Sequence, residues 1–236
     1  MRARALLAAY AVVALTNVAG QLVDSDWPDR LTKPLLVPLL LAHLLLHAGD
    51  RGSRLVRATA AGLVCCWLGD LALMVDGWFL VGLAMFLGGQ IGYCVAFATT
   101  WSRNPIRTRK ALAAPYVGWW VLLLVVLGPD LGGLVVPVAV YGAVLCTMAA
   151  LALGVHRLTA AGAVSFVASD SLLAATSLSD RLAFPGDEAL VMATYVVGQL
   201  LIVLGVLASR PPRPAAVPAP GASTTSASAT SADPRS

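Results

Sequence analysis

Charged residues are scarce in this chain of 236 residues: they make up 12% of it, whereas soluble domains carry roughly 25%. Apolar residues make up 58%. This composition excludes a soluble globular enzyme and a disordered protein. The net charge of +4 does not indicate a nucleic-acid partner either, because the positive residues are scattered between long apolar runs.

Metal-ligand spacings are absent as well. The four cysteines (Cys65, Cys66, Cys94 and Cys146) lie inside apolar runs, show no C-x2-C spacing and are expected to be free and buried. His43 and His47 share a helix face, but no carboxylate or cysteine near them completes a ligand set. We therefore expect no metal and no organic cofactor.

Long apolar runs dominate the sequence instead, and each is close to the 20 or so residues that a spanning helix needs. We predict an all-α, polytopic membrane helical bundle in residues 1–209, followed by a disordered cytoplasmic tail, 210–236, rich in Pro, Ala, Ser and Thr. A cleaved signal peptide is the alternative for the first run. The eight predicted transmembrane helices are 5–23, 34–48, 56–75, 78–99, 111–128, 131–153, 158–178 and 188–208.

Lysine and arginine indicate the orientation, because they favour the cytoplasmic side. With eight spans and a cytoplasmic N-terminus, 13 of the 16 positive residues lie on the inner side, and only Arg30, Lys33 and Arg181 lie outside. We therefore expect an integral protein of a bacterial plasma membrane with both termini in the cytoplasm.

An internal duplication relates the two halves. The segment from Arg57 aligns without a gap to the segment from Arg157, and the pairs include Gly62 with Gly162 and Asp70 with Asp170. Residues 86–90 resemble residues 195–199 in the same way. The simplest architecture is a 4+4 internal repeat whose axis runs along the membrane normal.

Apart from Glu188, the first residue of the last predicted span, Asp70 and Asp170 are the only acids within the predicted spans, where a carboxylate is costly. Each lies thirteen residues past an inner-boundary arginine, which is roughly 20 Å into a core of about 30 Å. A pair at one depth favours a shared catalytic site, in which the two carboxyls lie near each other. The alternative is that each is paired with a neighbouring helix and only fixes packing.

Several other polar residues are predicted to reach the same level and to contact a substrate: Lys33, Asn17, Tyr195, Gln90, Gln199 and Ser169. The alternative for most of them is an interhelical hydrogen bond. Lys33, expected at the start of the second helix beside Pro34, is a candidate anchor for a phosphate or an acid, or it extends to water.

Five segments together resemble one known family, the YhhN-like lysoplasmalogenases: RLTKPL at 30–35, WLGDLAL at 67–73, FLGGQIGY at 86–93, GAVSFVASDSLLA at 162–174 and TYVVGQLLI at 194–202. The resemblance implies eight membrane helices and hydrolysis of the vinyl ether bond of a lysoplasmalogen, a lysophospholipid with a single chain. The products are a fatty aldehyde and a glycerophospho-alcohol. The chain departs from the family pattern at Phe97, where many members carry a histidine.

The chemistry of the acids agrees with that activity. Hydrolysis of a vinyl ether needs a proton donor and a nearby anion, and two close carboxyls that share one proton supply both. A proton-coupled small-molecule transporter that uses the same two aspartates is the alternative. An intramembrane aspartyl protease is disfavoured, because the segment that ends at Asp70 lacks the first glycine of G-x-G-D.

Overall fold

The computed structural model describes residues 2–23 and 26–209, and within these residues helices are joined by turns and loops, with no strand. The prediction of an all-α protein is therefore confirmed, whereas the predicted tail, 210–236, lies outside the described residues. The helices are α1 (Arg2–Leu22), α2 (Asp26–His47), α3 (Arg54–Leu73), α4 (Phe79–Ala98), α5 (Ala114–Leu131), α6 (Val135–Ala152), α7 (Arg157–Leu178) and α8 (Asp187–Ala208).

Six segments of the described chain are long and apolar enough to cross a membrane: Arg4–Leu22, Arg54–Leu73, Phe79–Ala98, Lys110–Ala152, Arg157–Leu178 and Asp187–Ala208. The fourth covers both α5 and α6, which are joined by a short 3-10 turn. The second helix, α2, is not among the six. These lengths and compositions are those of an integral membrane protein.

The second helix differs from its prediction. It begins at Asp26, eight residues before the expected start at position 34, so Lys33 lies inside the helix rather than in its first turn. Both Pro34 and Pro38 are interior, and Pro38 has no N–H to offer the Pro34 carbonyl one turn earlier. The Trp67 indole of α3 donates to that carbonyl at 2.9 Å. A tertiary contact thus replaces the missing helical bond, which the local sequence alone does not reveal.

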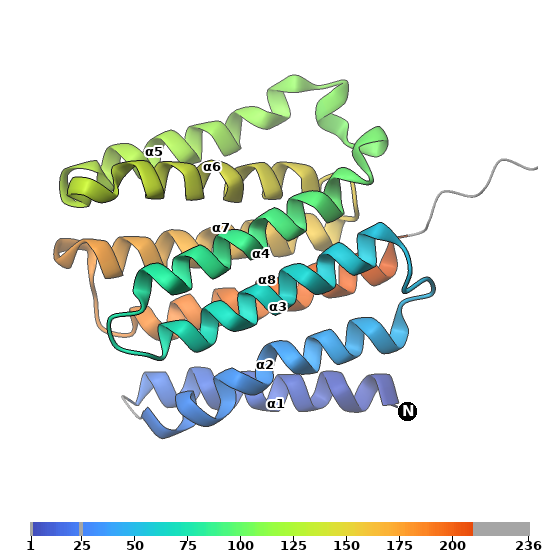
Figure 1. The fold of residues 1–236 in the computed structure, drawn as a ribbon, viewed down its shortest axis with the longest axis horizontal. Coiled ribbons are helices and arrows are strands. Elements are labelled where there is room, and N and C mark those ends of the chain that lie inside the picture. Colours follow the sequence, from blue (N-terminus) through green and yellow to red (C-terminus); the bar gives the residue numbers. More distant parts are fainter. Residues whose placement is uncertain (1, 24–25, 210–236) are drawn as a thin grey trace, which may run out of the picture.

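The helices lie side by side along one direction (Figure 1). The pair α1 and α2 forms one edge, the pair α5 and α6 forms the other, and α3, α4, α7 and α8 lie between them. The N-terminal end of α1 and the C-terminal end of α8 lie at the same end of the bundle. The most extensive helix packing is between α7 and α8 and between α3 and α4.

Glycine allows both of these central pairs to approach closely. A Cβ on Gly162 would lie 2.7 Å from the Gly198 carbonyl oxygen, and one on Gly198 would lie 3.0 Å from the Gly162 oxygen. The other pair repeats this arrangement, with 3.0 Å from Gly62 to the Gly89 oxygen and 3.2 Å in the reverse direction. Small residues at such crossings are typical of membrane helices, whose association depends on close packing.

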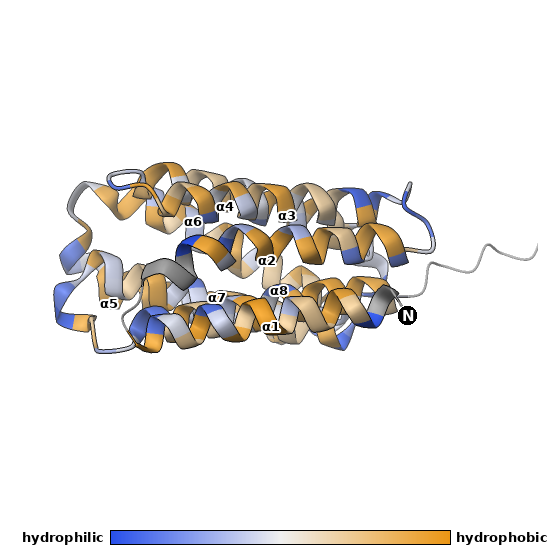
Figure 2. Cartoon of the chain, turned by 90° about the horizontal axis from the view of Figure 1, so that it is seen from below, coloured by the Kyte–Doolittle hydropathy of each residue, from blue (hydrophilic) through white to orange (hydrophobic). Residues whose placement is uncertain are grey.

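The outer surface is apolar along the helices and hydrophilic mainly at their two ends (Figure 2). Large aliphatic side chains are exposed on this surface, among them Leu15, Val117, Val125, Val136 and Val197. Polar side chains are buried instead, including Asp70, Gln90, Asp170 and Gln199. This distribution matches lipid as the surrounding solvent and a polar interior.

Candidate functional site

The two intramembrane acids line the same cavity. Asp70 comes from α3 and Asp170 from α7, and their exposed fractions are 2% and 8%. The cavity has a volume of about 380 Å³ and lies between α3, α4, α7 and α8, with Lys33 of α2 in its wall. Its lining residues are Gln21, Lys33, Asp70, Leu73, Phe79, Phe86, Ser169, Asp170, Leu173, Thr176, Ser177, Asp187, Glu188, Val191, Met192 and Tyr195.

A chain of hydrogen bonds leads to Asp70 from α8 and α4. The Tyr195 hydroxyl donates to Asp70 Oδ2 at 2.7 Å, and Gln199 Nε2 donates to the Tyr195 oxygen at 3.3 Å. The Tyr93 hydroxyl donates in turn to Gln199 Oε1 at 2.6 Å. Because all four residues are buried, this network holds the Asp70 carboxyl in one orientation.

Aromatic packing positions the Tyr195 ring. Phe166 contacts it edge to face with centroids 5.5 Å apart, and Phe86 does so from the other helix pair at 6.0 Å. Such contacts restrict the ring and thereby aim its hydroxyl at Asp70.

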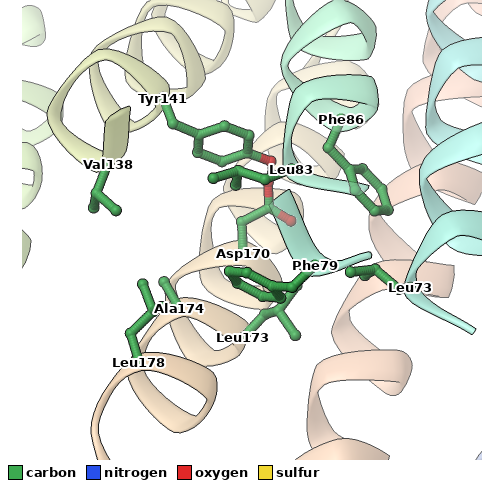
Figure 3. A pocket seen from close by; sticks show the side chains of 10 residues that line it. All are labelled: Leu73, Phe79, Leu83, Phe86, Val138, Tyr141, Asp170, Leu173, Ala174 and Leu178. Carbon is green, nitrogen blue, oxygen red and sulfur yellow. Dashed lines mark hydrogen bonds between the residues drawn. The ribbon is translucent and has the colours of Figure 1, made fainter. Parts of the chain in front are cut away.

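Asp170 also accepts through its Oδ2, from two donors on other helices. Tyr141 of α6 donates its hydroxyl to Oδ2, and Gln90 Nε2 of α4 donates to the same oxygen at 3.4 Å. Figure 3 shows the Tyr141 hydroxyl meeting one carboxyl oxygen while the other points away. Within the described residues, Oδ1 accepts no hydrogen bond, so it remains available to carry a proton.

The cavity becomes more polar toward the connection between α7 and α8. Thr176, Ser177, Asp187 and Glu188 line that part, and Ser177 and Glu188 are exposed. Ser169 directly precedes Asp170 on α7. Its hydroxyl donates to the Val191 carbonyl at 2.9 Å and so links the cavity wall to α8. Water therefore has a polar route from this end of the bundle to the carboxyls.

The structure brings together Asp70, Asp170, Lys33, Ser169 and Tyr195 as lining residues of one cavity. Gln90 and Gln199 lie behind it and contact the acids or their partners. Asn17 is placed elsewhere: it is buried between α1 and α2, where its amide donates to Thr32 Oγ1 at 2.8 Å and it is not part of the cavity lining.

The histidine pair of α2 also lies apart from the acids. The rings of His43 and His47 are 4.5 Å apart, and neither residue lines the cavity. Among the described residues no three His, Cys, Asp or Glu side chains gather in a way that suits a metal ion.

Sequence reasoning missed three residues of the site. Tyr141 is the direct partner of Asp170, Tyr93 ends the Asp70 network, and Gln21 lines the cavity. Tyr141 carried a signal that was available, because it is a hydroxyl in the middle of an otherwise apolar run. Its partner on another helix was not visible in the sequence.

The fold and the site together define a helical integral membrane protein with two buried carboxyls in one polar cavity. A model of the YhhN family matches residues 29–206, so this chain belongs to the YhhN family. No solved structure matches it.

Curated relatives extend this finding. The chain is 34% identical to lysoplasmalogenase TMEM86B of Sus scrofa, over 77% of this chain and 76% of the relative. It is 31% identical to lysoplasmalogenase TMEM86B of Homo sapiens, over 80% and 79%. Lysoplasmalogenase TMEM86A of Homo sapiens is 30% identical over 79% of this chain and 81% of the relative. The relatives support a hydrolase rather than a transporter.

Phe97, at the position where many family members carry a histidine, is fully buried and stacks on Tyr93 with ring centroids 5.8 Å apart. It therefore packs behind the network of Asp70 rather than lining the cavity. The site of this chain has hydroxyl, amide and carboxyl groups around its centre, and it has no imidazole among the lining residues.

Proposed function

We propose that this protein hydrolyses the vinyl ether bond of a lysoplasmalogen, or of a related single-chain lysolipid, by catalysis with two carboxyls. The observation that carries the proposal is the position of Asp70 and Asp170 in the wall of one buried cavity, with Lys33 in the same wall. A lone carboxyl would explain packing, but two in one cavity supply an acid and a base. The family and the names of the relatives agree with this chemistry.

In the proposed reaction Asp170 is the proton donor. Its Oδ1, which accepts no hydrogen bond among the described residues, delivers a proton to the β-carbon of the vinyl ether. The electron pair of the C=C bond forms the new C–H bond, and the positive charge is shared by the α-carbon and the ether oxygen. Asp70, which accepts a hydrogen bond from Tyr195, is the carboxylate that stabilises this cation.

Water completes the reaction. It adds to the α-carbon and returns a proton to Asp170, which gives a hemiacetal. The hemiacetal hydroxyl then loses its proton while the bond from the α-carbon to the glycerol oxygen breaks, and that oxygen is protonated. The products are a fatty aldehyde and a glycerophospho-alcohol, and one water is consumed. The mechanism requires the two carboxyls to lie within a hydrogen bond or one water of each other, which remains a prediction.

For the membrane arrangement, we propose eight spans in a 4+4 repeat with both termini on the cytoplasmic side. The reciprocal glycine approaches of Gly62 with Gly89 and of Gly162 with Gly198 support the repeat, since aligned positions make the same contact in each half. The placement of the two chain ends of the helical region at one end of the bundle supports an even number of spans. The cavity then faces the outer half of the bilayer.

The direct test is product analysis with purified protein in lipid vesicles. A 1-alkenyl lysolipid, its saturated 1-alkyl analogue and a 1-acyl ester lysolipid are compared, and aldehyde and glycerophospho-alcohol are measured by mass spectrometry. We expect aldehyde from the alkenyl lipid alone, with one deuterium at its second carbon when the reaction is run in D₂O. Release of fatty acid from the ester, or no product from any of the three lipids, would contradict the proposed function.

A further inference from the structure

An apolar crevice adjoins the polar cavity at Asp170. It lies between α4, α6 and α7, and its free volume is about 30 Å³. Its walls are Leu73, Phe79, Leu83, Phe86, Val138, Tyr141, Asp170, Leu173, Ala174 and Leu178, most of which Figure 3 shows pointing toward one space. Half-buried residues such as Leu83, Val138 and Leu178 form its rim toward the bilayer.

The crevice adjoins the cavity along a shared wall. The two spaces share five wall residues: Leu73, Phe79, Phe86, Asp170 and Leu173. A molecule that reaches from one space into the other therefore passes the carboxyl of Asp170. The crevice offers no polar partner besides that carboxyl and the Tyr141 hydroxyl, and these two are bonded to each other. Its occupant must be apolar.

A second crevice also touches Asp170 but is less well connected. It lies between α5, α6 and α7 and is lined by Leu123, Leu124 and Leu127, among others. It shares only Asp170 with the polar cavity, whereas it shares Val138, Tyr141, Asp170 and Ala174 with the first crevice. A molecule with its polar end in the cavity therefore meets more shared wall on the side of the first crevice than on the side of the second.

We propose that the crevice between α4, α6 and α7 binds the alkenyl chain of the lipid substrate and determines the chain length that the enzyme accepts. This inference rests on the proposed function. The polar headgroup lies in the cavity on the side of Lys33, the chain extends past Asp170 into the bilayer, and the vinyl ether lies between them. The narrow crevice suits one unbranched chain and not the two chains of a diacyl lipid.

The direction of the chain agrees with the roles of the acids. The β-carbon of a vinyl ether lies on the chain side of the bond, and the oxygen lies on the headgroup side. With the chain in the crevice, the β-carbon is next to Asp170, which delivers the proton. The charge then develops toward the headgroup side of the site.

The first experiment measures binding and does not depend on hydrolysis. A saturated 1-alkyl lysolipid with a diazirine at the chain end is bound to the wild-type protein in vesicles, irradiated and mapped by peptide mass spectrometry. We expect labels on α4, α6 and α7 around Leu83, Val138 and Leu178. Labels on Leu123, Leu124 or Leu127, or labels confined to the outer lipid-facing surface, would overturn the proposal.

The second experiment compares matched variants at the two crevices. Leu83→Trp and Leu178→Trp fill the first crevice, and Leu124→Trp, which also replaces a half-buried leucine, fills the second. We expect the first two to shift kcat/KM toward short-chain lysoplasmalogens by about tenfold relative to long-chain ones, which corresponds to about 1.4 kcal/mol. Leu124→Trp should leave the chain-length profile unchanged.

The outcomes separate the two proposals. If the wild type cleaves no chain length while the probe labels the first crevice, the proposed function fails and the binding site stands. If the wild type is active but the profiles of all three variants match it, the chain-binding inference fails. A shift caused by Leu124→Trp alone would also overturn it.

Discussion

The two carboxyls of the cavity occupy matched positions in the two halves of the chain, yet their surroundings differ. Asp70 receives a tyrosine hydroxyl from α8, and that tyrosine is held by a glutamine and by two aromatic rings. Asp170 accepts from a tyrosine of α6 and a glutamine of α4, and its side chain borders two apolar crevices as well as the polar cavity.

Under the proposed internal repeat, this difference teaches how two related halves can yield an asymmetric site. The helix crossings remain alike, because the same glycine contacts occur in both halves. The side chains around the acids differ, so one carboxyl is held within a network and the other borders the apolar space that we propose for the lipid chain. We infer that the common framework sets the depth of the acids and that the local partners set their roles.

The strongest test of this comparison replaces each acid in turn. Asparagine keeps the shape of aspartate but cannot act as a carboxylic acid or a carboxylate. Asp170→Asn should lower kcat by about 10²–10⁴-fold, the usual contribution of a general acid. Asp70→Asn should lower it by about 10²–10³-fold, as expected for lost stabilisation of a developing charge.

Aldehyde release, normalised to folded protein, measures both effects, and the remaining activity distinguishes the roles. The Asp70→Asn variant still has its proton donor, so its slow reaction should keep a solvent deuterium isotope effect on kcat. Asp76→Asn is the control, because Asp76 is exposed in the turn after α3. Turnover near that of the wild type in either variant would show that the carboxyl takes no part in the chemistry.

Substitutions at the glycine crossings test whether the same close packing stabilises both halves. Gly162→Ala places a methyl group 2.7 Å from backbone atoms of α8, and Gly62→Ala places one 2.8 Å from the Tyr93 ring. Either change should destabilise the protein by about 1–3 kcal/mol, the usual cost of overpacking. Thermal unfolding in detergent measures it.

Gly118→Ala is the matched control for both, because a Cβ on Gly118 of α5 meets nothing within 4 Å. This substitution should leave the unfolding midpoint unchanged or raise it, since alanine favours a helix over glycine by about 1 kcal/mol. If Gly62→Ala and Gly162→Ala behave like Gly118→Ala, the close approaches do not determine the packing of the two halves.

A smaller effect is expected from the two tyrosines, which are the local partners of the acids. Tyr195→Phe removes the hydroxyl that holds Asp70 and should lower kcat by about tenfold, since a hydrogen bond to a charged group is worth about 1.5–3 kcal/mol. Tyr141→Phe should cost less, because Gln90 still contacts the same oxygen of Asp170. Steady-state kinetics with equal amounts of folded protein compare them, and a larger loss in Tyr141→Phe would contradict the assigned roles.

Much of this site could be predicted from the sequence because a membrane makes polar residues conspicuous. Asp70, Asp170, Tyr195 and Ser169 stand out within apolar runs, and they line one cavity in the structure. The helices themselves were predicted from the length of those runs. Which helix faces which was not available, and for that reason the bond between Tyr141 and Asp170 was missed and Asn17 was assigned to the site.

The start of α2 shows a different limit of sequence reasoning. The charged segment before Pro34 indicated a helix that begins at position 34, since proline suits the first turn of a helix. The structure continues the helix back to Asp26 and past both prolines, and Trp67, on another helix, satisfies the carbonyl that Pro38 leaves unpaired. The local rule missed this because it cannot include a hydrogen-bond donor from another helix.

The smallest effect is expected from Lys33. Among the lining residues of the cavity it is the only lysine or arginine, and it comes from the first half of the chain. Lys33 lines the cavity together with both acids, and we propose that its ammonium group binds the phosphate of a lysolipid headgroup. Phosphate binding is common to the ground state and the transition state, so Lys33→Ala should raise KM by up to about tenfold and change kcat little.

Lys33→Arg should recover most of the affinity, while Arg30→Ala, which removes an exposed cation of the same helix, should leave KM unchanged. Rates measured over a range of lysoplasmalogen concentrations separate KM from kcat. A fall in kcat at unchanged KM would instead assign Lys33 to the chemistry of the two acids, and the headgroup would then have to be bound elsewhere in the cavity.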